Sequence, residues 1–329
     1  MSLQTLTITQ GMETLRFVVG GREIAAVRLN VLILVTPFTR LVADIESSKP
    51  KAAQLVGKPD IFVIPAHPVA EEVQRLTFAP GMIRYVGPSA PRYSISLHGT
   101  FADYLAKFSH KSRYNIVRSV RKFAEHSGGE IKVREFSTPE QLKEFARLAD
   151  EISRYSWAVK IGGGGFAGRV PEAQLMKLAH ERAARGFVLF DHERPIAYVF
   201  CHAQSENLLY EYIAYDETYA KWSPGTVLLY LLVESLFREQ RFERLDLGEG
   251  TLGYKSFFAT DATPCVRVIY FRRRLRYVIL VFAHLGLARA SIAMGGLLRT
   301  VGMKTKLKRL MMGKARRPGQ ELERSAKAA

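Results

Sequence analysis

The first residues that suggest chemistry stand at the start of an apolar helix, in the stretch KWSPGTVLLYLLVESLF (221–237). Proline suits the first turn of a helix, where its missing N–H is no loss, and Ser223 before it is a good cap. Gly225 leaves this turn without a side chain, so unpaired backbone N–H groups could approach a phosphate closely. The alternative is an ordinary helix entry with no ligand, because short motifs also occur by chance.

Other kinds of chemistry have little support in the sequence. The eight histidines do not fall into metal-ligand spacing, Cys201 and Cys265 are the only cysteines, and no Gly-x-Ser-x-Gly motif occurs. We therefore expect no metal site, no disulfide scaffold and no serine triad. The N-terminus lacks the basic and apolar regions of a secretory signal, so we expect a cytoplasmic protein.

The net charge of +17 is concentrated in two segments of the 329-residue chain. Residues 271–329 hold 15 Lys and Arg against 2 Glu, and residues 107–122 hold six Lys and Arg with no acid. Charged partners are therefore to be sought at these two segments rather than inferred from the overall charge.

The second of these segments lies in a stretch (96–126) whose periodicity predicts an amphipathic helix. Its basic side is either a solvated face or a contact for a polyanion or phosphate. Arg113 leans toward the apolar flank, and an arginine directed inward usually has an anionic partner. The apolar side comprises Leu105, Phe108, Ile116, Val120 and Phe123, and the basic side Lys107, Lys111, Arg118 and Lys122.

The elements that must position these residues follow a recognisable order. Residues 1–90 contain short apolar runs broken by Gly and Pro, which predict strands with few helices. After the basic helix come two further helices and three strand-like runs separated by turns. The helix after Pro224 follows, and then a strand, a short helix and a last strand. The three strand-like runs are GFVLFDHE, RPIAYVFCHAQ and LLYEYIAYD, whose turns suit antiparallel hairpins.

This order resembles the GNAT acyltransferase fold, an α+β fold with a mixed, mostly antiparallel sheet flanked by helices. Three pieces are similar to the CelD/BcsL-type acetyltransferases of cellulose and exopolysaccharide synthesis, which are related to the FemAB transferases. They are KSRYNIVRSVRKF (111–123), YAKWSPGTVLL (219–229) and LDLGEGTLGYKSFFA (245–259). The resemblance covers roughly residues 92–273, and three pieces in order are more specific than any one of them.

The resemblance implies an acyl-CoA donor, acetyl-CoA or another, whose pyrophosphate is held at the helix start by Trp222, Ser223, Pro224, Gly225 and Thr226. FemAB-like relatives use aminoacyl-tRNA instead, so an aminoacyl-tRNA-dependent transferase is an alternative. A non-catalytic GNAT scaffold is another. The acceptor, either a saccharide or another small molecule with an amine or hydroxyl, is not specified by the sequence.

Acyl transfer also needs a base and donors for the developing oxyanion. The resemblance implies that the thioester enters where the third hairpin strand and the next strand separate. Glu211 could be a partly desolvated base with a raised pKa, and Asp246 is the rival candidate. The alternatives are that Glu211 is a strand carboxylate paired with Arg or Lys, and that Asp246 is a turn residue that caps its own backbone. The resemblance points to Tyr254 and Lys255 as substrate or acyl-donor contacts, and to Tyr254 also as an acid toward the leaving thiolate. From its angle on the helix, Arg113 is a further candidate for substrate binding. The alternative for Tyr254 is a core aromatic next to Phe257 and Phe258.

The basic C-terminal part predicts a membrane contact. Residues 277–298 are long enough to span a bilayer, but His284 and Arg289 interrupt them, so we expect a helix lying on the anionic inner face of the cell membrane. The alternative is RNA binding, as a tRNA-using relative would require. The expected organisation is a β-rich region (1–90), an acyltransferase domain (91–273) and a basic tail (274–329). A degenerate GNAT-like half is one alternative for the first region.

Overall fold

The computed structural model describes residues 7–19, 22–35, 60–71, 73–79, 81–157, 164–250 and 252–300. Contacts divide the chain into two compact units. One contains the described residues up to Pro91 together with those from Thr263 onward, and the other contains Arg92–Ala262. The C-terminal segment, expected as a tail, thus groups with the N-terminal strands. Strands β5 (Met82–Ser96) and β11 (Asp261–Arg272) contribute residues to both units.

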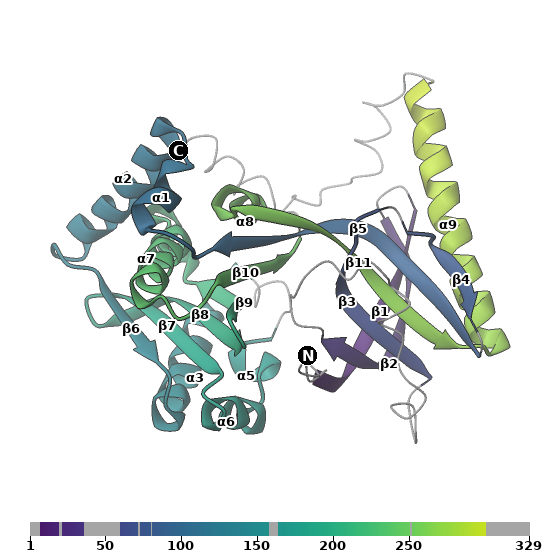
Figure 1. Ribbon diagram of the computed structural model, residues 1–329, viewed down its shortest axis with the longest axis horizontal. Helices are drawn as coiled ribbons and strands as arrows, with labels where there is room; N and C mark the ends of the chain where they lie inside the picture. The colour runs from purple at the N-terminus through teal and green to yellow at the C-terminus, as the bar shows by residue number, and fades with distance from the viewer. Residues whose placement is uncertain are drawn as a thin grey trace. The chain divides into compact units, whose positions relative to one another are not determined.

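The second unit is a mixed α+β fold of the GNAT type, in which the expected order of elements is confirmed (Figure 1). Its strands lie in the order β5, β10, β9, β8, β7, β6, and all neighbours are antiparallel except β9 and β10. The bounds are β6 Lys132–Phe136, β7 Ala184–Asp191, β8 Arg194–Gln204, β9 Asn207–Tyr215 and β10 Arg244–Glu249.

Helices cover both faces of these strands (Figure 1). On one face a core forms with α1 (Phe101–Ala106), α2 (His110–His126) and α7 (Pro224–Glu239), and on the other with α3 (Pro139–Arg154), α5 (Phe166–Arg169) and α6 (Glu172–His180). Gly186 lets α3 pack closely, because a Cβ there would lie 2.4 Å from the Phe145 ring. A 3₁₀ helix, η3 (Glu217–Trp222), precedes α7, and α8 (Gly253–Phe258) follows β10.

The predicted single basic helix is two helices. Helix α1 ends before Lys107, and Ser109 starts α2 by accepting a hydrogen bond from the Ser112 N–H (3.2 Å). A serine that caps a new helix offers the backbone an alternative to continuing the old one. The apolar side is still largely as expected, since Phe108, Ile116 and Phe123 are buried.

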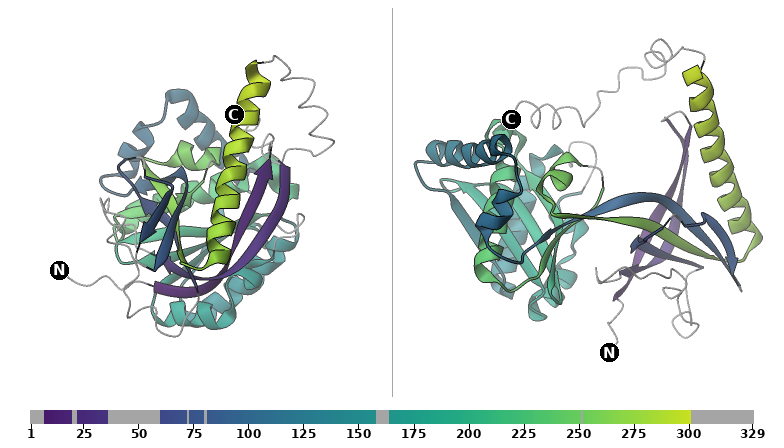
Figure 2. Two further views of the ribbon diagram at one scale, coloured as in Figure 1. Left: turned by 90° about the vertical axis from the view of Figure 1, so that its right-hand side faces the viewer. Right: turned by 45° about the horizontal axis from the view of Figure 1, so that its top comes forward.

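The first unit is β-rich, as predicted. Its strands lie in the order β1 (Thr7–Val19), β2 (Arg22–Val35), β3 (Ile61–Pro68), β11 and β5, with β4 (Leu76–Ala79) on β5. Helix α9 (Leu275–Thr300) runs beside β1 (Figure 2). Among the described helices, none is both long and apolar enough to cross a membrane.

Candidate active site

Strand β9 carries a β-bulge at Glu211. Tyr210 pairs with Cys201 on β8 and Tyr212 pairs with Phe200, so Glu211 is an extra residue with no counterpart on that strand. The bulge reverses the alternation of side chains: Leu208 and Tyr210 before it, and Ile213 and Tyr215 after it, all face the core beneath α7. Bulges commonly occur next to active sites, where they redirect a side chain.

Strands β9 and β10 separate immediately before this bulge. Their parallel pairing, in the described residues, is limited to Asn207–Leu209 against Arg244–Asp246. Beyond Asp246, the pairing of β10 with β5 contains a second bulge, with Gly248 rather than Leu247 opposite Tyr93. Glu211 therefore lies where two neighbouring parallel strands have stopped pairing, which is the place the resemblance assigns to a thioester.

The surroundings of Glu211 suit a proton acceptor. Its side chain reaches solvent, but protein atoms crowd it enough for desolvation to raise the pKa of the carboxyl, against the opposing effect of a hydrogen bond with Tyr212. A raised pKa brings a carboxylate closer to the basicity that proton transfer needs near neutral pH. A role as the base stays a prediction for Glu211.

The start of α7 follows β9 by way of η3. Ser223 has a left-handed backbone (φ 52°, ψ 49°), and its side chain makes no capping hydrogen bond, so the expected side-chain cap is wrong. The first hydrogen bond across the entry runs from the Val227 N–H to the Ser223 carbonyl (3.1 Å). The N–H groups of Gly225 and Thr226 thus lie in the first turn, which a helix cannot pair internally.

The local charge at this helix start favours an anion. The first turn of α7 contains no acidic residue, and Lys221 lies just before it. A Cβ on Gly225 would be in ordinary contact, 3.8 Å, with the Tyr215 ring, so the protein's own packing does not demand glycine there. Trp222 stacks on His126 of α2, with ring centroids 4.2 Å apart. Backbone amides at a helix start are suited to phosphate.

Asp246, the rival base, has both carboxylate oxygens engaged. Oδ2 accepts hydrogen bonds from Nε and Nη2 of Arg92, and the distance from Nε is 2.8 Å. Oδ1 accepts a hydrogen bond from the Gly248 N–H at 2.8 Å. The aspartate is 2 % exposed and Arg92 is also buried. This arrangement matches both structural alternatives, an ion pair and a turn cap, and it favours them over a role as base.

Helix α8 brings Tyr254 and Lys255 to the same region. Burial raises the pKa of Tyr254 to about 12, and the partly buried Tyr254 ring packs against the same core cluster that contains Tyr210, the residue before the β9 bulge. The Lys255 Nζ donates to the Glu249 carbonyl (2.9 Å), and burial lowers its pKa against the attraction of Asp246 and Glu249. Of the two neighbouring phenylalanines, Phe258 is buried and Phe257 is 40 % exposed.

The end of α8 is tied to α1. Tyr104 donates a hydrogen bond to the Phe258 carbonyl (2.9 Å), and the Lys107 Nζ donates to the carbonyls of Phe258 and Ala259. Lys107 was assigned to a solvated or anion-binding face, but its ammonium instead caps the last turn of α8. The position of Tyr254 therefore depends on a lysine of another element.

Arg113 is not brought into this group. Its side chain is exposed rather than directed inward, and within the described part of the chain it makes no ion pair. The exposed Tyr114 and Val117 lie beside it on α2. A role in substrate binding stays a prediction for Arg113, as it does for Lys255.

Three features of the site were not anticipated from the sequence: the bulge, the Arg92 partner of Asp246, and the Trp222–His126 stack. The bulge did leave a signal. In LLYEYIAY the core-facing residues Leu208, Tyr210, Ile213 and Tyr215 follow spacings of two, three and two, which is one residue out of step with a regular strand. The other two features join distant segments and leave no local signal.

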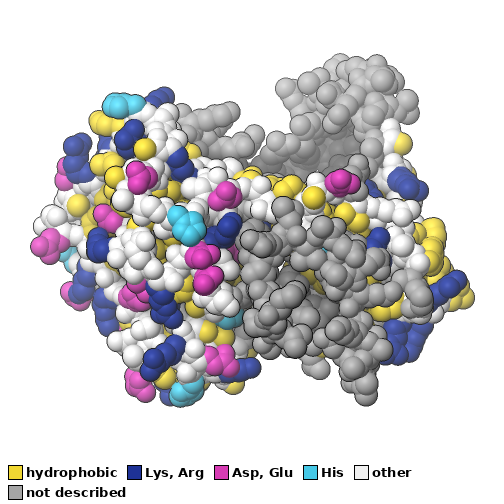
Figure 3. Space-filling view, viewed as in Figure 1, with side chains coloured by type: hydrophobic (Ala, Val, Ile, Leu, Met, Phe, Trp, Pro, Cys, Tyr) yellow, Lys and Arg dark blue, Asp and Glu magenta, His cyan; other side chains and the backbone are white. Residues whose placement is uncertain are grey.

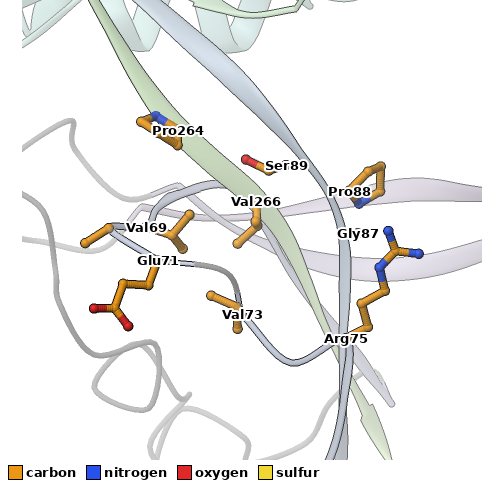
Figure 4. Close-up of a pocket in the computed structure, with 10 residues that line it drawn as sticks. Val69, Glu71, Val73, Arg75, Gly87, Pro88, Ser89, Pro264 and Val266 are labelled. Atoms are coloured by element: carbon orange, nitrogen blue, oxygen red, sulfur yellow. The ribbon is translucent and has the colours of Figure 1, made fainter.

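A separate hollow lies in the first unit (Figure 4). It has a volume of about 360 Å³ and is bounded by the segment after β3 and by β5 and β11. Val69, Val73 and Val266 converge on it, while Glu71 and Arg75 stand at opposite sides. Its walls are largely apolar and contain none of the predicted site residues.

Comparison with known families matches part of the second unit to one domain family. Residues 110–256, somewhat less than half of the chain, match the family described as "Acetyltransferase (GNAT) domain". The match includes α2, β9, the start of α7, β10 and the first part of α8, and so contains the candidate base and helix start. A search of the curated proteins finds no match.

Solved structures with a similar fold are remote in sequence. FemX is 11 % identical, with 83 % of this chain and 90 % of that chain covered at a TM-score of 0.48. The L-PGS of Bacillus licheniformis is 13 % identical, with 82 % and 86 % covered at 0.45. A tandem GNAT protein from the clavulanic acid biosynthesis pathway is 13 % identical, with 80 % and 82 % covered at 0.39.

Proposed function

We propose that this protein is an acyl-CoA-dependent acyltransferase, most similar in its motifs to the CelD/BcsL-type acetyltransferases. The observation that carries the proposal is the combination of Glu211 in a β9 bulge with the separation of β9 from β10, inside the region that matches the GNAT domain. The adjoining start of α7 offers backbone amides and no acidic side chain, which suits the diphosphate of a coenzyme A donor.

In the proposed reaction, the amine or hydroxyl of the acceptor attacks the carbonyl carbon of the thioester. Glu211 takes the proton that the acceptor loses, directly or through water, and the bond between carbon and sulfur breaks. Tyr254 gives its proton to the departing thiolate, and its pKa of about 12 keeps the phenol protonated at neutral pH. The transfer is direct, with no covalent intermediate on the protein. Asp246 and Arg92 hold the β10 turn in place.

The acceptor is proposed to be a saccharide or another small molecule that presents a hydroxyl or amine. Acetyl-CoA is the first donor to test, because the motifs resemble acetyltransferases. The proposal is tested by following free coenzyme A in the presence of acetyl-CoA and a panel of sugars, amino sugars and peptide amines. Wild-type protein should release thiol with at least one class of acceptor, whereas Glu211→Gln should do so about 10²-fold more slowly or worse.

Two other functions are distinguished by adding aminoacyl-tRNA as a second donor and by measuring coenzyme A binding beside turnover. Release of tRNA from aminoacyl-tRNA, with no thiol from acyl-CoA, would indicate a FemAB-like transferase. Binding of coenzyme A without turnover for any acceptor, and with no effect of Glu211→Gln, would indicate a non-catalytic GNAT scaffold. Thiol release that Glu211→Gln leaves unchanged would contradict the assigned base.

A further inference from the structure

The outward face of α9 is apolar over most of its described length. Leu275, Ile279 and Phe282 are 74, 60 and 50 % exposed. The exposed residues that follow are small and apolar (Ala283, Gly286, Ala290 and Ala293) except for Arg289, which adds one positive charge to this face. The whole helix contains no acidic residue. A helix that packs on a sheet normally turns charged and polar side chains to water, so this face is suited to a contact rather than to solvent.

The inward face of α9 is fixed, so the helix cannot simply rotate to hide the outward one. Tyr277, Val281 and Leu285 are buried in the core of the first unit. His284 is held at both ring nitrogens, with Nδ1 2.7 Å from the Tyr85 hydroxyl and Nε2 3.1 Å from the Arg16 carbonyl. These contacts specify which side of α9 faces outward.

The apolar surface continues onto β4. Phe78 is 49 % exposed and stacks on Phe282, with ring centroids 6.4 Å apart. We call Phe78, Leu275, Ile279 and Phe282 the α9 patch. Hydrophobic side chains gather over this end of α9 beside Lys and Arg side chains, at the right of Figure 3.

The border of the α9 patch is strongly basic. The Arg273 guanidinium lies over the Phe78 ring, 5.7 Å from its centroid, and Arg274 and Arg276 are exposed at the start of the helix. Both of the latter share a single carboxylate, Asp60, at 3.0 and 2.5 Å. The cluster therefore keeps an excess of positive charge. In sequence, residues 304–317 beyond the helix add seven Lys and Arg and no acid.

We propose that the α9 patch lies on an anionic lipid surface, with its aromatic and aliphatic side chains at the headgroup boundary and its arginines on lipid phosphates. This chemistry combines apolar burial with attraction to anionic lipid. A second copy of the chain is a poor occupant for the same face. Because α9 has no acidic residue, a symmetric contact brings positive charge onto positive charge in either relative direction.

The test is flotation of the full-length protein with vesicles of phosphatidylglycerol and phosphatidylcholine, and with phosphatidylcholine alone. Wild-type protein should bind the anionic vesicles, and high salt should weaken this binding. Ile279→Gln/Phe282→Gln should lower the partition coefficient about tenfold or more, because it removes two of the large exposed apolar side chains of the α9 patch. Thermal unfolding at the wild-type midpoint checks that the variant is folded.

Val117→Gln is the matched control, since Val117 is also exposed (45 %) and lies on the other basic helix, α2. It should leave vesicle binding unchanged. Equal binding by wild-type protein and the α9 double variant would overturn the proposal. So would a wild-type dimer that the double variant dissociates in sedimentation equilibrium without any vesicle binding by either protein, since the occupant would then be a second copy.

Discussion

At the scale of single residues, Glu211 and Asp246 are carboxylates on neighbouring strands with contrasting surroundings. Glu211 is the extra residue of a bulge, reaches solvent and has a raised pKa. Asp246 is buried, ion-paired with Arg92 and bound to a backbone N–H. A general base needs free lone pairs and a pKa near the working pH, so the two residues are suited to different tasks.

The raised pKa of Glu211 predicts the pH dependence of the proposed reaction. A base works only when deprotonated, so kcat/KM should fall as the pH is lowered through the pKa of Glu211. Because desolvation raises that pKa from its ordinary value of 4.5, the acid limb should have its midpoint above 4.5. The measurement is a pH profile of kcat/KM. If the profile of Glu211→Gln keeps the same acid limb with the same midpoint, a group other than Glu211 is titrating.

Asp246→Asn should act on stability first. The substitution removes the charge that balances buried Arg92, and breaking such a pair costs about 3–5 kcal/mol. We expect a clear loss in the free energy of unfolding by denaturant titration. Glu211→Gln should unfold like the wild type. A stable Asp246→Asn protein whose kcat falls about 10²-fold would instead support Asp246 as the base.

At the scale of elements, the site depends on contacts between α1, α8 and β10. Lys107 and Tyr104 of the α1 segment bind the last carbonyls of α8, and Lys255 of α8 binds the Glu249 carbonyl of β10. These three interactions hold the helix that carries Tyr254. Order in α8 therefore comes from other segments, because a six-residue helix has little stability of its own.

Lys107→Met keeps most of the side-chain volume but removes the ammonium group. We expect a loss of about 1.5–3 kcal/mol in unfolding free energy, the range for hydrogen bonds with a charged partner, together with slower turnover through a displaced Tyr254. Lys111→Met is the control, because Lys111 is exposed on α2. Equal effects of the two substitutions would indicate a general charge effect and not a cap.

Much of the element order could be predicted from the sequence because each element has a local periodicity and turn residues. The strands at β7, β8 and β9 and the helix after Pro224 were of this kind. The break at Lys107–Ser109 was missed because the apolar period continues through it while the Ser109 cap stops the helix. The exposure of Arg113 was missed for a related reason. Its angle was counted along one continuous helix, although a new helix begins after the break.

The candidate site was predictable in its residue types more than in its contacts. A carboxylate in an apolar strand and a Pro-Gly helix entry are visible in the sequence. The pairing of Asp246 with Arg92 joins residues 154 positions apart, so no local pattern could separate it from a free base. The same holds for Trp222 on His126.

At the scale of the whole molecule, the segment expected as a basic tail begins as part of the first unit's core. Tyr277, Val281 and Leu285 are buried among strands far earlier in the chain. Truncation before Tyr277 would remove these side chains together with the α9 patch. Point substitutions on opposite faces of α9 separate the two roles.

Leu285→Ala should lower the free energy of unfolding by about 2–5 kcal/mol, the usual range for a buried leucine. Ile279→Ala, on the exposed face of the same helix, should change it by about 0.5 kcal/mol or less. Denaturant titration of both variants measures the difference. A similar small effect from each would contradict the packing of α9 into the first unit.

The measurement that tests the central claim most directly is calorimetric titration of the protein with coenzyme A. Wild-type protein should bind it at one saturable site. Gly225→Val should bind at least about tenfold more weakly at an unchanged unfolding midpoint, because a branched side chain crowds the amides of the first turn of α7. Glu211→Gln should retain wild-type affinity, since the base does not hold the phosphates. Absence of binding by the wild type, or equal affinity in the wild type and Gly225→Val, would contradict an acyl-CoA site at the start of α7.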